Sequence, residues 1–242
     1  MRRALLAFAA WAALAGPSLA APTIAAIGNY THASGLTTGS LVTTADVAAG
    51  DTIVLVAGAN GNTSLNTISD CAGNTYSQGN IVLSVARLRV FWVLGAKAVA
   101  SGCTVNFTFS STTNSKAIGM YVAKGAPVFD QDGLGASGSS ASPAFTGSTI
   151  GLTGVQQALV IGAYTASGGG SDTVTESSGF STLDDLNVSG GVKLHVAYKV
   201  TSSTTAPAYA PTNSASRQWV ANVDVFKTPS PCINGLLMGA GC

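Results

Sequence analysis

Several short stretches of the chain alternate between apolar and polar residues with a period of two, which is the pattern of β-strands that bury one face. Such alternation is found at residues 87–94, 104–110, 118–122, 193–200 and 219–225. Two further runs, 53–57 and 158–164, are apolar at every position, as in strands buried on both faces. Glycine-rich turns separate these stretches at spacings of about 10 residues, which favours an antiparallel sandwich.

Three segments of the chain recur 106 positions later. They are residues 70–73, 51–57 and 88–92, which match 176–179, 157–163 and 194–198. A repeat that is too small to bury its own apolar face packs against its copy. We therefore expect an all-β fold, an antiparallel, jelly-roll-like β-sandwich, in which two pseudo-repeated halves (roughly 45–125 and 151–227) share one core.

The first 20 residues have the features of a signal peptide. Arg2 and Arg3 precede an apolar run at 4–15 that is short for a transmembrane helix, and Ala20 ends a stretch of small residues. The alternative is a retained membrane anchor. With residues 1–20 removed, we expect no membrane insertion and a secreted, extracellular or periplasmic protein.

The rest of the chain is interpreted as one domain, 21–227, followed by a Pro- and Gly-rich tail, 228–242. Residues 133–143 have the composition of a linker between domains. Each half alone would leave one face of its sheet exposed, so we expect the halves to pack together.

Charged residues make up only 9% of the chain, with 11 Lys and Arg against 10 Asp and Glu. A typical soluble domain has about 25%. This near-neutral balance gives no electrostatic basis for binding nucleic acid.

Four cysteines in an exported chain predict two disulfides. Cys71 and Cys103 both lack a counterpart in the second half, which predicts that they pair with each other. Cys232 and Cys242 would then close the tail. A metal site is the alternative, but no CxxC pair and no nearby histidine supports it.

The order of the motifs resembles that of a group of uncharacterised exported bacterial β-sandwich domains. The pattern, GD…SDxxGNTY…RxWVxxVxVF, is carried by residues 50–51, 69–76 and 217–226. The resemblance implies the fold alone and no catalytic residues.

We expect no enzymatic activity, because the known catalytic motifs are missing from the chain. It contains neither Gly-x-Ser-x-Gly nor Ser-x-x-Lys, and only two histidines. One of them, His195, stands on an alternating strand where Arg89 stands in the first half, which indicates a solvated outward position rather than a general base. Asp70 and Glu176 are expected to cap turns, although a glycosidase pair is the alternative.

No cofactor is expected, with calcium as the one alternative. Asp130 and Asp132, followed by a glycine, resemble the start of a calcium loop, but the later ligands are missing.

Binding is the function class that these observations favour, with carbohydrate or a protein at the cell surface as the partner. The candidate contact residues are Tyr76, Arg87, Arg89, Phe91 and His195. Phe91 is expected to be an exposed apolar side chain, unless the tail covers it. Trp92 and Trp219 are expected in the core. A structural, self-assembling subunit is the alternative, and a hydrolase is the least favoured.

Overall fold

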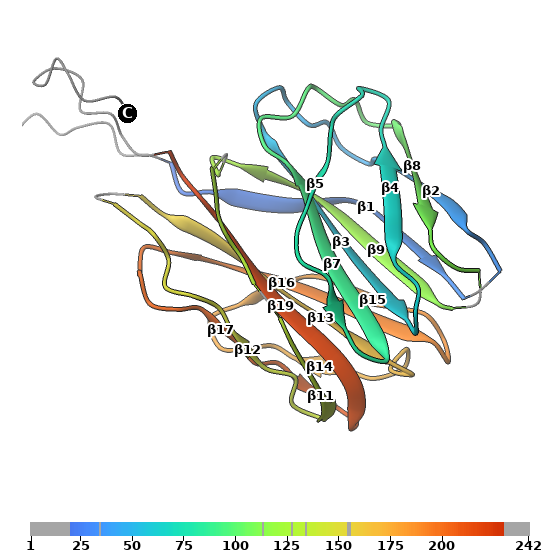
Figure 1. Ribbon diagram of the computed structural model, residues 1–242. Helices are drawn as coiled ribbons and strands as arrows, with labels where there is room; N and C mark the ends of the chain where they lie inside the picture. The colour runs from blue at the N-terminus through green and yellow to red at the C-terminus, as the bar shows by residue number, and fades with distance from the viewer. Residues whose placement is uncertain are drawn as a thin grey trace, which may run out of the picture.

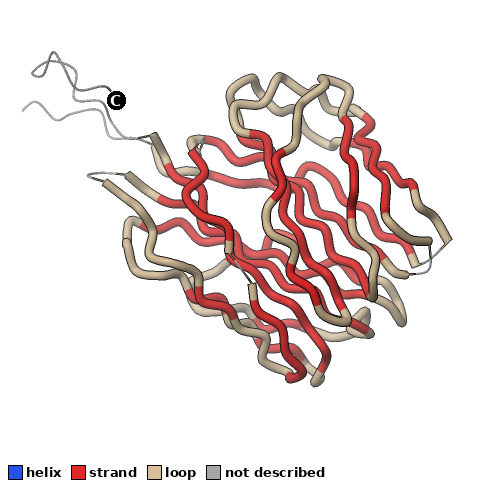
Figure 2. The backbone as a smooth tube through the Cα atoms, in the orientation of Figure 1, coloured by secondary structure: helices blue, strands red, loops and turns tan. Residues whose placement is uncertain are grey.

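The computed structural model describes residues 20–33, 35–112, 114–126, 128–133, 135–153 and 156–229. Every regular element in these ranges is a β-strand, and they contain no helix (Figure 2). All strand pairs are antiparallel. The all-β expectation is therefore confirmed. The expected signal peptide and the Cys232–Cys242 bridge lie outside the described residues.

The first half of the chain forms one six-stranded sheet, here called the first sheet. Its order is β1 (Thr23–His32), β9 (Lys116–Lys124), β3 (Thr52–Asn60), β7 (Ala86–Val93) and β5 (Ser77–Gln78), with β6 (Val82–Leu83) also pairing with β7.

The second half forms a six-stranded sheet of the same order, the second sheet. It runs β10 (Val128–Asp132), β19 (Arg217–Lys227), β13 (Ala158–Ser167), β16 (Val192–Thr201) and β15 (Ser181–Asn187), with β11 (Ala136–Ser140) also pairing with β19. β11 lies within the segment that has the composition of a linker, so that segment in fact extends the sheet.

The two sheets stack face to face (Figure 1), and the apolar side chains between them form one core. Leu88 and Val90 from the first sheet meet Leu194 and Val196 from the second, and all four are fully buried. Each sheet takes its strands from one half of the chain, which confirms the expected sandwich of two halves. The strand orders given above replace the general description of the fold as jelly-roll-like.

The outer faces of both sheets are also covered, which explains why β3 and β13 are buried at every position but the last. The first sheet is covered by a three-stranded outer sheet of β2 (Thr38–Val42), β8 (Thr104–Phe109) and β4 (Leu65–Ser69). The second sheet is covered by a smaller outer layer with two pairs, β12 (Phe145–Thr146) with β17 (Ala208–Tyr209) and β14 (Val174–Thr175) with β18 (Thr212–Asn213).

The strand registers show which positions of the two halves are equivalent. Leu88 lies opposite Gly58, and Leu194 lies opposite Thr165. The offset of 106 residues is therefore right for β7 and β16, but β3 and β13 are related by 107. The predicted alignment of the two apolar runs is thus wrong by one residue, which in a strand exchanges the two faces.

Candidate functional site

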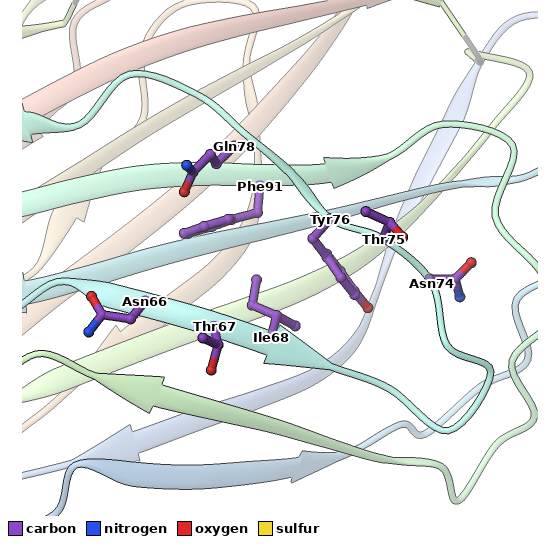
Figure 3. Close-up of a pocket in the computed structure, with 8 residues that line it drawn as sticks. All are labelled: Asn66, Thr67, Ile68, Asn74, Thr75, Tyr76, Gln78 and Phe91. Carbon is purple, nitrogen blue, oxygen red and sulfur yellow. The ribbon is translucent and has the colours of Figure 1, made fainter.

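An open groove of about 410 Å³ lies beside the first sheet, between two strand edges (Figure 3). One side is β4, which pairs only with β8, and the other is the segment that enters β5, which pairs only with β7. The groove is lined by Asn66, Thr67, Ile68, Asn74, Thr75, Tyr76, Gln78 and Phe91. Two of the five contact residues predicted from the sequence, Tyr76 and Phe91, are thus brought together here.

Asp70 holds the turn that carries Tyr76. Its Oδ1 accepts the backbone N–H groups of Ala72 and Asn74, both at 3.0 Å. Its Oδ2 accepts the side-chain amide of Asn74 and the hydroxyl of Tyr76, both at 2.9 Å. Gly73 adopts a φ of 66°, which favours glycine at this point of the turn. Asp70 thus caps the turn as predicted and also fixes the tyrosine ring.

The protonation states of this pair are well defined. Burial raises the pKa of Asp70, but hydrogen bonds from Asn74, Tyr76 and Ala72 outweigh it, so the net pKa of Asp70 is lowered. Burial, followed by the charge of Asp70, raises the pKa of Tyr76 far above its ordinary value. Tyr76 therefore remains a neutral hydroxyl that donates to a carboxylate.

The second half repeats this carboxylate-capped turn, but with a threonine in place of the tyrosine. Glu176 Oε1 accepts the backbone N–H of Ser177, and Glu176 Oε2 accepts the hydroxyl of Thr182 at 2.9 Å. Thr182 stands six residues after the carboxylate, as Tyr76 does, and Gly179 has a φ of 78°. The aromatic ring is therefore a specialisation of the first half.

The expectation that Phe91 is exposed is wrong, because only 3% of it is accessible. It points away from the shared core, but that side of the first sheet is covered by the outer sheet and not by solvent. Phe91 packs in that second core and presents only its edge to the groove, beside Ile68 and Tyr76 (Figure 3).

Three polar side chains of the groove are available to a ligand. Asn66, Thr75 and Gln78 are exposed, and among the described residues their side chains make no hydrogen bond. The sequence analysis missed Asn66 and Gln78, because isolated amides in a chain rich in polar uncharged residues carry no distinguishing signal.

Arg87 and Arg89 lie on β7 and point to the same side as Phe91, at positions partly buried. Arg87 donates to Asn62 Oδ1 at 3.2 Å and to the hydroxyl of Ser64. Arg89 donates from Nε to the Gly79 carbonyl at 2.8 Å, and its guanidinium lies 5.6 Å from the centre of the Phe91 ring. Both arginine side chains follow Phe91 along the same face of β7, but neither forms part of the groove lining.

His195 is not part of the groove, and its expected solvated position is wrong. It is only 2% exposed, because the smaller outer layer covers this face of the second sheet. Its Nε2 lies 2.9 Å from Glu176 Oε2, and its Nδ1 lies 3.3 Å from Asp185 Oδ1. Nearby, Lys193 Nζ lies 2.7 Å from Asp185 Oδ1 and also donates to Asn187 at 2.9 Å.

This arrangement favours a structural ion network over a catalytic base. Burial lowers the pKa of His195, but the hydrogen bonds to Asp185 and Glu176 outweigh it, and the net pKa is raised. Both ring nitrogens face carboxylates, so neither is free to accept a proton from a substrate. Glu176, the alternative glycosidase partner of Asp70, is thus hydrogen-bonded to His195.

Tyr209 and the two tryptophans contribute to the cores and not to the groove. Trp92 and Trp219 are 8% and 7% exposed, as expected for core residues. Tyr209 is fully buried in the core beneath the smaller outer layer, where its ring centre lies 5.0 Å from that of Phe180.

The two residues proposed to start a calcium loop have different environments. Asp130 forms an ion pair with Lys227 at 2.7 Å and accepts the Gly151 N–H, so its charge is satisfied. Asp132 instead accepts the backbone N–H of Asn80 at 2.5 Å. The described residues contain no group of three or more His, Cys, Asp or Glu side chains arranged to hold a metal.

The disulfide expected between Cys71 and Cys103 is present and ties the turn before Tyr76 to the start of β8. Among the described residues no helix is long and apolar enough to cross a membrane. No family model matches the chain, and no curated protein or solved structure is significantly similar to it.

Proposed function

We propose that this protein is an exported, non-enzymatic binding module whose groove between β4 and β5 binds carbohydrate. The observation that carries the proposal is the combination of a partly exposed Tyr76, fixed by Asp70, with unpaired amide and hydroxyl groups around it. Sugar rings stack their C–H faces on aromatic rings and exchange hydrogen bonds with such groups. A ring that is already fixed loses little conformational freedom on binding.

Export is supported by the disulfide and by the signal-like first 20 residues. Disulfides persist in oxidising compartments and are rare in the cytosol. The Cys71–Cys103 bridge is also placed where it steadies the groove, since Cys71 directly follows Asp70.

The test is a glycan-array screen of the purified protein, followed by calorimetry with a glycan that binds. Tyr76→Ala should weaken binding by about tenfold or more, the equivalent of roughly 1.4 kcal/mol. Tyr76→Phe, which keeps the ring but loses the hydrogen bond to Asp70, should weaken it less.

Thr182→Ala is the matched control, because it removes the equivalent hydrogen bond in the half that has a threonine instead of the ring. Its affinity should equal that of the parent protein. If no glycan binds, or if Tyr76→Ala and Thr182→Ala bind alike, the carbohydrate proposal is wrong. A protein ligand captured at the groove would then be the explanation to pursue.

Self-association through a strand edge is the second candidate. The ten-residue strand β1 lies at the edge of the first sheet and pairs within that sheet with β9 alone. Against it, β1 carries a bulge between Ala26 and Gly28, a feature that blunts edges. Light scattering over a range of protein concentrations distinguishes the two: growth in mass without ligand supports assembly, and a constant monomer mass supports a binding module.

A further inference from the structure

Two carboxylates face each other at one edge of the sandwich. Asp132 on β10 lies directly opposite Asp224 on β19 in the strand register. Asp224 is only 1% exposed and occupies a position equivalent to Tyr121 in the first sheet, facing the other sheet. Asp132 also accepts the N–H of Asn80, which belongs to the first half. The pair therefore lies where the two halves meet.

The buried oxygen atoms around this pair lack hydrogen-bond donors. Asp132 Oδ1, Asp224 Oδ1 and Asn222 Oδ1 are all buried without a partner among the described residues. Asn222 is itself 1% exposed, and its Nδ2 donates to Asp224 Oδ2 at 3.0 Å. Burying a polar oxygen without a partner costs roughly 1–3 kcal/mol, so the unpartnered oxygens of the two facing carboxylates indicate a missing positive partner.

Two glycines keep side chains away from these oxygens. A Cβ at Gly133 would lie 2.1 Å from Asn222 Oδ1, and a Cβ at Gly79 would lie 2.9 Å from Asp132 Oδ1. Any other residue at Gly133 would displace the amide. The backbone at these two glycines therefore lies close against the cluster.

The charges near the pair do not neutralise it. Arg89 is close enough for its charge to interact with that of Asp132, but its Nε is directed to the Gly79 carbonyl. Burial, and then the neighbouring Asp132, raise the pKa of Asp224 well above its ordinary value.

We propose that Asp132, Asp224 and Asn222 form a calcium site at the junction of the two halves. All three ligands are hard oxygen donors, which suit Ca²⁺ better than Zn²⁺ or Cu²⁺. In the structure the Asn222 amide nitrogen faces Asp224 and its Oδ1 lies against Gly133, so Oδ1 ligates the ion only after a flip of the amide, which exchanges the two atoms. Water completes the coordination. The site is separate from the groove and does not depend on carbohydrate binding.

The test measures thermal unfolding of the purified full chain with EDTA and with excess CaCl₂ at neutral pH, together with calorimetric titration by CaCl₂. At a concentration about 100 times Kd, Ca²⁺ should raise the unfolding midpoint by about 5–10 °C. One ion should bind per chain.

Asp224→Asn and Asp132→Asn should each abolish the calcium-dependent increase. Asp130→Asn is the matched control on the same strand: it loses the ion pair with Lys227 but should keep the full calcium shift. A parent protein with no calcium heat and no shift would overturn the proposal and leave a shared proton as the partner of these oxygens. A shift that persists in Asp224→Asn would overturn it equally.

Discussion

At the scale of single residues, the outward faces of the two large sheets hold polar side chains that are buried and paired. His195 is the clearest case, because it lies between Glu176 and Asp185 beneath the smaller outer layer. The alternation of its strand correctly separates its two faces. It does not predict what covers the outer face, because that layer comes from residues distant in the chain. The exposure of Phe91 was wrongly predicted for the same reason, because the sequence does not show that the outer sheet covers it.

The ion network around His195 should make stability depend on pH. The folded pKa of His195 is raised above the unfolded value of about 6.5, so its stabilising contribution is present below that pH and is lost as the pH rises through the folded pKa. The pKa values of Glu176 and Asp185 are lowered, so their contribution is lost as the pH falls below about 4. Urea unfolding across this range should show the largest contribution between about pH 5 and 6.5.

His195→Gln separates this effect from the rest of the molecule. The variant should be less stable than the parent near pH 6 by about 1.5–3 kcal/mol, because Glu176 loses its charged hydrogen-bond partner and Asp185 keeps only Lys193. The difference should shrink above the folded pKa of His195. An equal difference at pH 6 and pH 9 would contradict this account.

At the scale of elements, the two halves use different chemistry at one equivalent position. Cys71 and Cys103 form a disulfide in the first half. Ser177 is the counterpart of Cys71, and its hydroxyl accepts the backbone N–H of Ala210 at 3.1 Å. A covalent bond in the first half and a hydrogen bond in the second thus each connect the capped turn to the outer layer that covers its sheet.

Replacing both Cys71 and Cys103 by serine should lower the free energy of unfolding by about 3.5 kcal/mol, the loop-entropy value for a separation of 32 residues. Ser177→Ala, which removes the corresponding hydrogen bond, should cost only about 1 kcal/mol. Chemical denaturation of the two variants measures both values. Equal losses would show that the bridge contributes no more than its counterpart.

Strand positions were predictable from the sequence wherever only one face is apolar. Leu88 and Leu194 could be aligned correctly because charged and polar residues flank them on both sides. The runs 53–57 and 158–164 could not be aligned to the residue, because a strand that is apolar on both faces carries no signal for which face is which. The groove was predictable only through Tyr76 and Phe91, since three of its other lining residues come from β4 and depend on how the outer sheet docks.

At the scale of the whole molecule, one core between the sheets joins the halves, flanked by a further core on each outer side. Leu88 and Leu194 occupy equivalent, fully buried positions in the shared core. Removing either side chain should therefore lower the stability of the whole molecule and not of one half alone.

Leu88→Ala and Leu194→Ala should each lower the free energy of unfolding by about 2–5 kcal/mol. Leu83→Ala is the control, because Leu83 is 54% exposed and should cost less than 1 kcal/mol. Unfolding followed by fluorescence in Trp92→Phe and Trp219→Phe variants should give coincident transitions. Separate midpoints would show that the halves unfold independently.

Because the disulfide lies beside the groove, the structure of the groove depends on redox conditions. The structure of the smaller outer layer does not. A thiol reductant would release the Asp70 turn from β8 and loosen the ring beside it, while the smaller outer layer, joined by hydrogen bonds, would be untouched. On the proposed function, ligand binding would then be lost in a reducing cytosol and acquired only after passage to an oxidising space. Such a chain would stay inert toward glycans of the cell that synthesises it.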